Sequence, residues 1–334
     1  MSKAFDQLSD SCRASLRRCS QPAWIEPMLA TLTESYFSDP DWIYERKLDG
    51  VRCLVFKDGD KIRIVSRNRR NMNAAWPELV EDLERESCSD FIADGEIVAF
   101  EGARTSFSKL QHRIGIRKAK DAREQRTPVY LYLFDILHLD GYDTSALAQR
   151  ERKALLKRAL AFDGRIRYTP HRNERGVPYL EEACTKGWEG IIAKDALAPY
   201  ARGRSRRWLK FKCVHQQELV IGGFTEPRGS RKGFGALLVG YYENGELRYA
   251  GKVGTGFDDA TLTKLAERLR SIEREPSPFS DALKDKSAHF VEPKLVGEFG
   301  FTEWTGSGKL RHPRFLGLRS DKEPESVRRE RPAA

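Results

Sequence analysis

The chain has 334 residues, enough for one large domain or two ordinary ones, and 40% of them are apolar, so a full core can form. This composition excludes an intrinsically disordered or collagen-like chain. Lysine and arginine number 59 against 49 aspartate and glutamate residues, and the net charge of +10 favours an anionic partner without identifying it.

Targeting and redox signals are weak. No apolar run reaches the ~18 residues of a membrane span, and the first twenty residues lack the apolar core of a secretory signal. We therefore expect a cytoplasmic protein with no membrane partner. The cysteines never occur as C-x-x-C or beside a histidine at the spacing of a zinc site, so we expect six free thiols. They are Cys12, Cys19, Cys53, Cys88, Cys184 and Cys213.

The first two thirds of the chain carry the alternation of strands and the periodicity of helices. Strands are predicted over 42–47, 51–57, 61–67, 91–100 and 129–139. Short turns such as Asp58-Gly59 and Asp94-Gly95 are expected to join them. Helices are predicted over 75–85, 146–160 and 178–186, the last ended by Gly187. These elements indicate an antiparallel-rich α+β domain.

A strand-rich region follows. Strands are predicted over 218–224, 236–242, 247–253 and 296–304, with one helix over 258–272. This content suits a small barrel such as an OB-fold. We place the boundary near Cys213–Gln217 and expect an N-terminal extension at 1–24, a first domain at 25–213 and a second domain at 214–334.

Positive charge is concentrated in two segments. Residues 104–126 hold eight basic residues against Asp121 and Glu124, and an ordinary solvated face explains them equally well. Residues 202–212 hold six basic residues and no acidic ones. Because Trp208, Leu209 and Phe211 are interleaved there, we expect a strand whose lysines point one way and line a cleft.

The segment from Glu45 to Arg52 joins two predicted strands. It reads Glu45-Arg46-Lys47-Leu48-Asp49-Gly50-Val51-Arg52. A lysine at a strand end, followed by a tight Asp-Gly turn and an arginine, can hold an amine against an anion. A charged but ordinary hairpin is the alternative explanation.

Further motifs follow in order along the chain. They are Ser66-Arg67-Asn68, Asp94-Gly95-Glu96, Phe134-Asp135, Glu189-Gly190-Ile191-Ile192-Ala193-Lys194, Trp208-Leu209-Lys210-Phe211-Lys212 and Arg319-Ser320-Asp321-Lys322. With the segment around Lys47, this ordered set resembles the nucleotidyltransferase motifs of ATP-dependent DNA ligases. The match runs from about Pro27 to Arg331 and is most similar to the ligase module of bacterial ligase D, the end-joining enzyme. We expect that module without the polymerase and phosphoesterase modules that often accompany it.

The resemblance implies a fold and a reaction. The fold is α+β, a nucleotidyltransferase (ATP-grasp-like DNA ligase) domain with antiparallel-rich sheets, followed by a C-terminal OB-fold β-barrel. In the reaction, Lys47 attacks the α-phosphate of ATP to form a lysyl-AMP, AMP moves to the 5′-phosphate of a nick, and the 3′-hydroxyl displaces it. Lysine has a pKa of about 10.4, so cations must lower the pKa of Lys47. The candidates are Lys194, Lys210, Lys212 and a bound Mg²⁺.

The resemblance also implies residue roles. Glu45 and the backbone at Leu48 would read the adenine, with Phe134 and Ile192 on its two faces, although a phenylalanine in an apolar strand is otherwise a core residue. The resemblance further implies that Arg52 and Glu96 hold the ribose and that Glu189 with Glu96 binds Mg²⁺, or Mn²⁺ as the alternative. It implies contacts to the α-phosphate for Lys194, Lys210 and Lys212, and a contact to the terminal phosphate or the DNA end for Arg67. Contacts to the pyrophosphate are implied for Arg319, Asp321 and Lys322.

The implied partner is nicked or broken duplex DNA, held through its phosphates and therefore without sequence preference. A Ku-like end-binding protein or a separate repair polymerase would assist, and a monomer is expected. Two alternatives remain: an RNA ligase or GTP-using capping enzyme of the same superfamily, and a non-catalytic DNA-end-binding protein.

Overall fold

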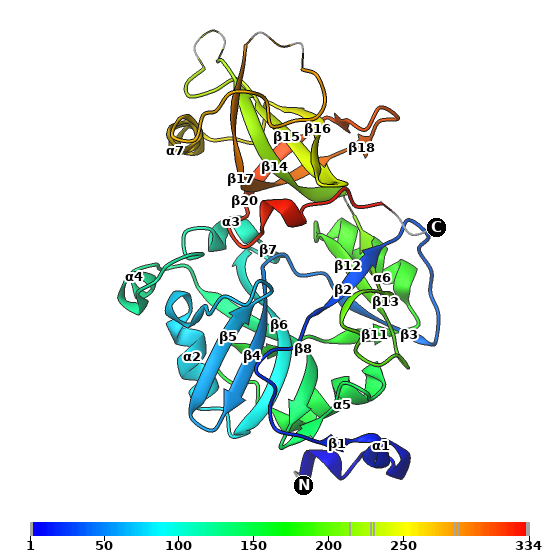
Figure 1. Ribbon diagram of the computed structural model, residues 1–334. Helices are drawn as coiled ribbons and strands as arrows, with labels where there is room; N and C mark the ends of the chain where they lie inside the picture. The colour runs from blue at the N-terminus through cyan, green and yellow to red at the C-terminus, as the bar shows by residue number, and fades with distance from the viewer. Residues whose placement is uncertain are drawn as a thin grey trace. The chain divides into compact units, whose positions relative to one another are not determined.

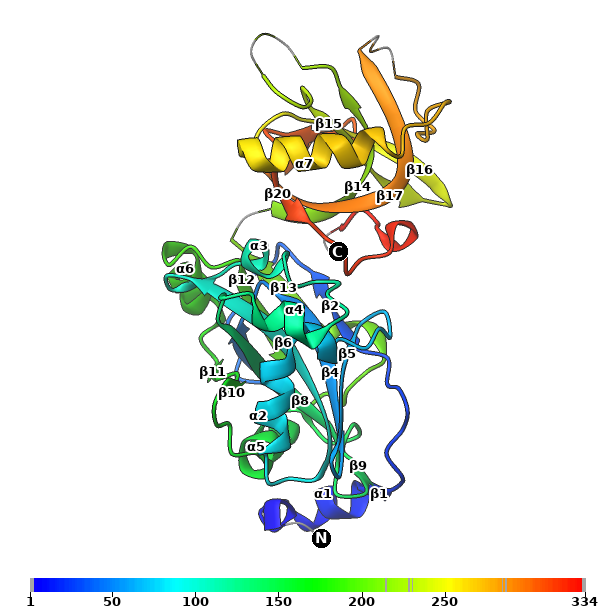
Figure 2. The same cartoon turned by 90° about the vertical axis from the view of Figure 1, so that its left-hand side faces the viewer.

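The computed structural model describes residues 3–213, 215–227, 229, 231–283, 285 and 287–331. The chain divides into two compact units, the first formed by Met1–Cys213 with Arg331–Ala334 and the second by Val214–Glu330. Each unit has a hydrophobic core of its own (Figures 1 and 2). Among the described residues, no helix is both long enough and apolar enough to cross a membrane.

The first unit contains a sheet in the order β1-β9-β8-β6-β4-β5, with β10 beside β8 and β7 beside β6. All of its pairings are antiparallel except that of β10 with β8. Its strands are β1 Arg17–Arg18, β4 Val51–Asp58, β5 Lys61–Ser66, β6 Asp90–Glu101, β7 Arg104–Thr105, β8 Val129–Leu139, β9 Tyr142–Asp143 and β10 Ile166–Tyr168.

A second sheet of the same unit has the order β11-β3-β12-β13-β2. Only β13 and β2 pair in parallel. One apolar cluster contains Leu54, Phe56 and Phe134 of the first sheet together with Met28 and Trp208 of the second, so the two sheets pack through it. The strands are β2 Met28–Leu32, β3 Trp42–Arg46, β11 His171–Asn173, β12 Gly190–Asp195 and β13 Gly203–Lys212.

Helices cover the outer faces of both sheets. Leu79 of α2 and Leu155 of α5 enter the core on the far face of the first sheet, and Leu180 of α6 packs behind the second. Gly187 follows α6 with a φ of +66°, as the sequence predicts for a helix end. The helical segments are η1 Lys3–Phe5, α1 Asp10–Ser15, η2 Asn73–Ala75, α2 Pro77–Glu84, α3 Phe107–Leu110, α4 Ala119–Arg123, α5 Gln149–Ala159 and α6 Gly176–Thr185.

The second unit is built on a five-stranded antiparallel sheet in the order β16-β15-β14-β17-β20. Leu262, Leu265 and Leu269 of its helix belong to its core, as the helical period predicts. The four predicted strands correspond to β14, β15, β16 and the second half of β17, and the predicted helix to α7, whereas β20 was not predicted. The elements are β14 His215–Thr225, β15 Leu237–Glu243, β16 Glu246–Val253, α7 Asp259–Arg270, β17 Ala288–Phe301, β18 Glu303–Trp304, β19 Leu310–Arg311, β20 Arg314–Leu318 and η3 Pro324–Ser326.

Two sequence predictions are wrong. Asp94-Gly95 is no turn but lies inside β6, where a Cβ on Gly95 would come within 2.8 Å of the Tyr132 carbonyl oxygen. The expectation of six free thiols also fails, because Cys184 and Cys213 form a disulfide across 29 residues with their Cα atoms 5.2 Å apart. The fold brings the end of α6 beside the end of β13, a proximity that cysteine spacing does not reveal.

Candidate active site

Lys47 is the first residue after β3, and its position is fixed by the neighbouring strand. Its backbone N–H donates to the carbonyl of Gly190 at 2.9 Å. Its ammonium forms an ion pair with the carboxylate of Glu189, the residue that precedes β12. The two side chains are 19% and 10% exposed. The antiparallel pairing of β3 with β12 therefore brings together two residues 142 positions apart.

The Asp49-Gly50 pair makes specific contacts that an ordinary hairpin turn would not need. The Asp49 carboxylate accepts a hydrogen bond from the backbone N–H of Phe107 at 3.2 Å, at the start of α3. A Cβ on Gly50 would lie 2.1 Å from the carbonyl oxygen of Ile97, so only glycine fits. The loop that carries Lys47 and Leu48 is thus clamped against β6 and α3.

The pairing of β12 with β13 gathers the predicted positive charge. Ile192 lies opposite Lys210, Lys194 opposite Trp208, and Gly190 opposite Lys212. Because directly opposed residues share a face of a sheet and alternate residues repeat it, these side chains belong to one face. The predicted one-sided lysines of residues 202–212 are confirmed for Lys210 and Lys212.

Glu45 is buried between two lysines on that face. Its carboxylate lies 2.7 Å from the ammonium of Lys153 and 2.7 Å from that of Lys194. Burial alone would raise the pKa of Glu45, but the two lysines outweigh it and lower that pKa. Among the described residues, Glu45 Oε1 and Lys194 Nζ have no well-oriented hydrogen-bond partner beyond these ion pairs, so each keeps capacity for a further polar contact.

The ring of Phe134 lies beside Lys194 and Arg52, at a point where the pairing of β8 with β6 is irregular. Gly95 pairs with Leu133 and Asp94 with Asp135, so Phe134 is an extra residue in β8. Its ring lies 4.5 Å from the ammonium of Lys194 and 4.7 Å from the guanidinium of Arg52, and it meets Trp208 edge-on at 6.1 Å. The ring therefore stands at the charged edge of the apolar cluster between the sheets.

Arg52 is paired with Asp94 through its Nε and one terminal nitrogen, Nη2. Its guanidinium donates to both oxygens of Asp94 at 2.6 Å, and the Tyr200 hydroxyl donates to the same carboxylate at 2.5 Å. Burial would lower the pKa of Arg52, but Asp94 outweighs it and raises that pKa. Glu96, predicted to share a role with Arg52, lies directly opposite it in the β4–β6 register and is partly exposed.

The expected lowering of the pKa of Lys47 is wrong for this state. Burial and Lys212 both lower the pKa, but the ion pair with Glu189 outweighs them and raises it. Lys194 is directed to Glu45 instead of Lys47. Lys47 is therefore held as an ammonium.

The remaining predicted residues lie elsewhere. Arg67 is exposed in the turn that follows β5. Arg319 is a residue of the second unit and donates to both oxygens of Asp321 at 2.9 Å. Lys322 forms a 2.7 Å ion pair with Glu218 of the same unit.

Sequence reasoning missed three members of the site. Lys153 occupies an ordinary helical pattern in α5 and gave no signal. Asp94 and Trp208 stand in the motifs that begin with Asp94-Gly95 and Trp208-Leu209, but sequence reasoning assigned neither of them a role of its own. Each becomes recognisable through its partner: Glu45, Arg52 and Phe134, respectively.

Comparison with known proteins identifies the family. One family model, the ATP dependent DNA ligase domain, matches residues 27–212, and another, the ATP dependent DNA ligase C terminal region, matches residues 230–322. The solved structure of mycobacterial DNA ligase D complexed with ATP and MES has a TM-score of 0.65 and 33% identity, and the match covers 92% of this chain and 98% of that one. These matches confirm the predicted fold class.

Two curated relatives support the same family. The multifunctional non-homologous end joining protein LigD of Pseudomonas aeruginosa is 37% identical over 324 residues, covering 93% of this chain and 37% of that protein. The LigD of Mycolicibacterium smegmatis is 35% identical over 318 residues, covering 92% and 40%. The chain thus spans about two fifths of the length of these relatives. It belongs to the ATP-dependent DNA ligase family.

Proposed function

We propose that this protein seals 5′-phosphate/3′-hydroxyl nicks or breaks in duplex DNA through a lysyl-AMP and a DNA-adenylate. The observation that carries the proposal is Lys47 at the end of β3, paired with Glu189 and under the influence of the charge of Lys212, which shares one face of the sheet with Lys210. An amine beside cations suits attack on a phosphate, because the cations offset the charge that develops there.

The adenine would be read by the buried pair of Glu45 and Lys194. Glu45 Oε1 can accept a hydrogen bond from the exocyclic amine, and Lys194 Nζ can donate one to a ring nitrogen, which would satisfy both groups. Phe134 and Ile192 would lie on the faces of the base, and the backbone at Leu48 would contact it. Arg52 and Glu96 would hold the ribose once Arg52 exchanges part of its contact with Asp94.

In the first step, the neutral Nζ of Lys47 forms a bond to the α-phosphorus, the bond to the bridging oxygen breaks, and pyrophosphate leaves. The proton of Lys47 is lost before attack, and the nearby charge of Lys212 favours its loss. Lys210 and Lys212 would contact the α-phosphate. In the second step, an oxygen of the 5′-phosphate displaces Lys47 from AMP; in the third, the 3′-hydroxyl displaces AMP.

The carboxylates present fit a magnesium ion. Mg²⁺ is held by one or two protein carboxylates together with phosphate oxygens and waters, so Glu189 and Glu96 are sufficient protein ligands. Bound there, Mg²⁺ or Mn²⁺ would neutralise charge on the phosphates.

We infer that residues 25–213 form the adenylyltransferase domain and residues 214–334 the OB-fold domain, with 1–24 as an extension. Arg319, Asp321 and Lys322 would act on the pyrophosphate in the first step only, and Arg67 on the terminal phosphate or the DNA end. The segment Cys213–Gln217 would serve as a hinge, although its Val214 lies outside the described residues. The names of the relatives support end joining as the pathway. A Ku-like protein and a repair polymerase would be its partners, and it would act as a monomer in the bacterial cytoplasm.

Labelling with ATP tests the proposal. Incubation with ATP labelled at the α-phosphate and Mg²⁺ should attach label to the wild-type protein and not to Lys47→Ala, and the labelled protein should seal a nicked duplex. Lys186→Ala, which removes an exposed lysine of α6's end, is the matched control and should label normally. Normal labelling of Lys47→Ala would overturn the assignment, and labelling by GTP instead of ATP would favour the capping-type alternative.

A further inference from the structure

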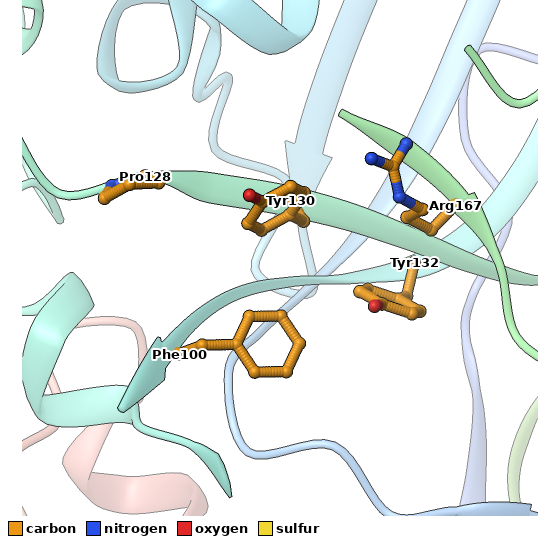
Figure 3. A pocket seen from close by; sticks show the side chains of 5 residues that line it. All are labelled: Phe100, Pro128, Tyr130, Tyr132 and Arg167. Atoms are coloured by element: carbon orange, nitrogen blue, oxygen red, sulfur yellow. The ribbon is translucent and has the colours of Figure 1, made fainter. Parts of the chain in front are cut away.

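A pocket on the first sheet plays no part in the reaction described above. It has a volume of about 430 Å³ and is lined by Phe100, Pro128, Tyr130, Tyr132 and Arg167 (Figure 3). Pockets that hold small ligands measure about 300–1,000 Å³, so this one has room for a single small group. Its lining consists of three aromatic rings, a proline and one guanidinium.

The strand register builds this lining. Glu96 of β6 lies opposite Tyr132 of β8, and Val98 lies opposite Tyr130, so Phe100 continues the same face one step further along. The Phe100 ring centre lies 5.8 Å from that of Tyr130 and 6.2 Å from that of Tyr132. Three rings from two adjacent strands therefore form an aromatic wall, in which the Phe100 ring stands edge-to-face to the rings of Tyr130 and Tyr132, at 70° and 61°.

Arg167 adds the positive charge. It belongs to β10, where it lies beside Tyr132, and its guanidinium stands 5.4 Å from the ring of Tyr130. Two backbone carbonyls, those of Gly164 and Ile166, accept hydrogen bonds from its Nη1. Because only one terminal nitrogen is so engaged, the guanidinium retains donors for a ligand.

The pocket adjoins the proposed active site. Tyr132 lies opposite Glu96 and two residues before Phe134 in β8, a separation of about 7 Å along a strand. Arg46, the residue before Lys47, places its guanidinium 5.9 Å from the Phe100 ring. The aromatic wall thus continues the strands that carry the chemistry.

The lining selects among ligands. Aromatic rings stack on any base with little regard to sequence, and arginine binds phosphate, so together they suit a nucleotide. Paired bases have their faces covered by the neighbouring pairs, which leaves unpaired nucleotides as the fitting group. An ATP-dependent ligase that acts on broken ends meets such nucleotides at overhangs and frayed termini.

We propose that this pocket binds one unpaired nucleotide of a DNA end, with its base against the aromatic wall and its phosphate on Arg167. The inference rests on the proposed function, because it takes DNA as the substrate. It gives the enzyme a site for the nucleotide that would otherwise obstruct the break.

A fluorescent base can report the contact. A nicked duplex with one unpaired 2-aminopurine at the break, on the 3′ or the 5′ side, should lose fluorescence on binding the wild-type protein, because stacking quenches this base. A duplex with the same probe paired far from the nick should not. The Tyr130→Leu/Tyr132→Leu variant should abolish the quenching and bind the unpaired substrate at least about fivefold more weakly, the lower end of the loss expected for one stacked base.

Conservative variants keep the test independent of folding. Tyr130→Phe should quench as the wild type does, and Arg167→Gln should weaken binding while Arg167→Lys retains most of it. Labelling by ATP serves as the check that each variant is folded. Quenching in the double leucine variant equal to that of the wild type, or no quenching by a wild type that seals nicks, would overturn the inference. A wild type that neither labels nor seals would instead refute the proposed function.

Discussion

Two carboxylates organise the cations around Lys47, and they do so differently. Glu189 holds one lysine, Lys47, whereas Glu45 is shared by Lys153 and Lys194. A buried carboxylate with two lysines leaves one positive charge uncompensated, and that charge lies against the Phe134 ring. Such an excess is costly in a protein interior and favours an electron-rich ligand. This charge would therefore favour the nucleotide that we propose for the site.

Lys153 is one of the two lysines that share Glu45, and burying its charge makes the stability of the protein depend on pH. Burial lowers the pKa of Lys153 to about 8, against about 10.4 in an unfolded chain. Between about pH 8 and 10 the unfolded state binds more protons, so the contribution of Lys153 to the free energy of unfolding rises with pH. Urea denaturation of wild type and Lys153→Met should show the wild type gaining about 1–3 kcal/mol relative to the variant from pH 7.5 to 10.

The control for this measurement is Lys157→Met, which removes an exposed lysine from the same helix. The difference in the free energy of unfolding between Lys157→Met and the wild type should stay constant over the same pH range. A constant difference for Lys153→Met as well would show that the buried ammonium does not titrate there.

At the scale of elements, the disulfide between Cys184 and Cys213 joins the end of α6 to the residue after β13. The strand it secures carries Trp208, Lys210 and Lys212. The crosslink therefore supports the strand that supplies two cations of the site, Lys210 and Lys212.

Removing this crosslink should destabilise the protein. A disulfide closing a loop of about 30 residues contributes about 2–4 kcal/mol, largely by restricting the unfolded chain. Adding a reductant should lower the thermal midpoint of the wild type and leave that of Cys184→Ser unchanged. Cys88→Ser, which removes a free thiol of the first unit, should remain sensitive to reductant. Equal midpoints with and without reductant in the wild type would contradict the expectation.

The elements show what sequence could supply. Alternation predicts β8 to the residue, yet it cannot reveal that Phe134 is an extra residue, because the partner strand decides which residues pair. Asp-Gly is a turn at Asp58-Gly59, where φ is +58°, but not at Asp94-Gly95, where the glycine admits a close backbone. The order of the motifs predicted the residues around Lys47. Lys153 lies in none of these motifs, and its place beside Glu45 is visible only from the tertiary contact between them.

At the scale of the whole molecule, the count of 59 basic residues overstates the cations available to DNA, because some of them are paired inside the protein. Arg113, in the basic segment 104–126, is buried and donates to Glu78 and to the Ala75 carbonyl. Arg319 is engaged by Asp321 and Glu298. The other seven basic residues of that segment are exposed, so a solvated or DNA-binding face remains there after the internal pairs are removed.

The proposed division of labour between the two units predicts a separation of activities. Lys322→Ala should slow lysyl-AMP formation at least about tenfold, because a charge opposite the leaving pyrophosphate is lost. Sealing of a nick that already carries AMP on its 5′-phosphate should change much less. Rapid-mixing assays of the two reactions measure both.

The matched variant is Glu218→Gln, which removes the ion pair of Lys322 and keeps the lysine. It should form lysyl-AMP at close to the normal rate. If Lys322→Ala impairs both reactions equally, the residue supports local structure or DNA binding, and the proposed hinge is wrong.

The extra residue in β8 has a consequence for chain length. Deleting one residue from a strand normally shifts the pairing and turns the following side chains over. Deleting Phe134 would instead make the Leu133–Gly95 and Asp135–Asp94 pairs consecutive. The shortened strand would be the more regular one, and the sheet would lose only the ring beside Arg52 and Lys194. Regular hydrogen bonding with β6 would need one residue fewer at this point of β8. The chain keeps the extra residue, which supplies the ring of the proposed adenine contact.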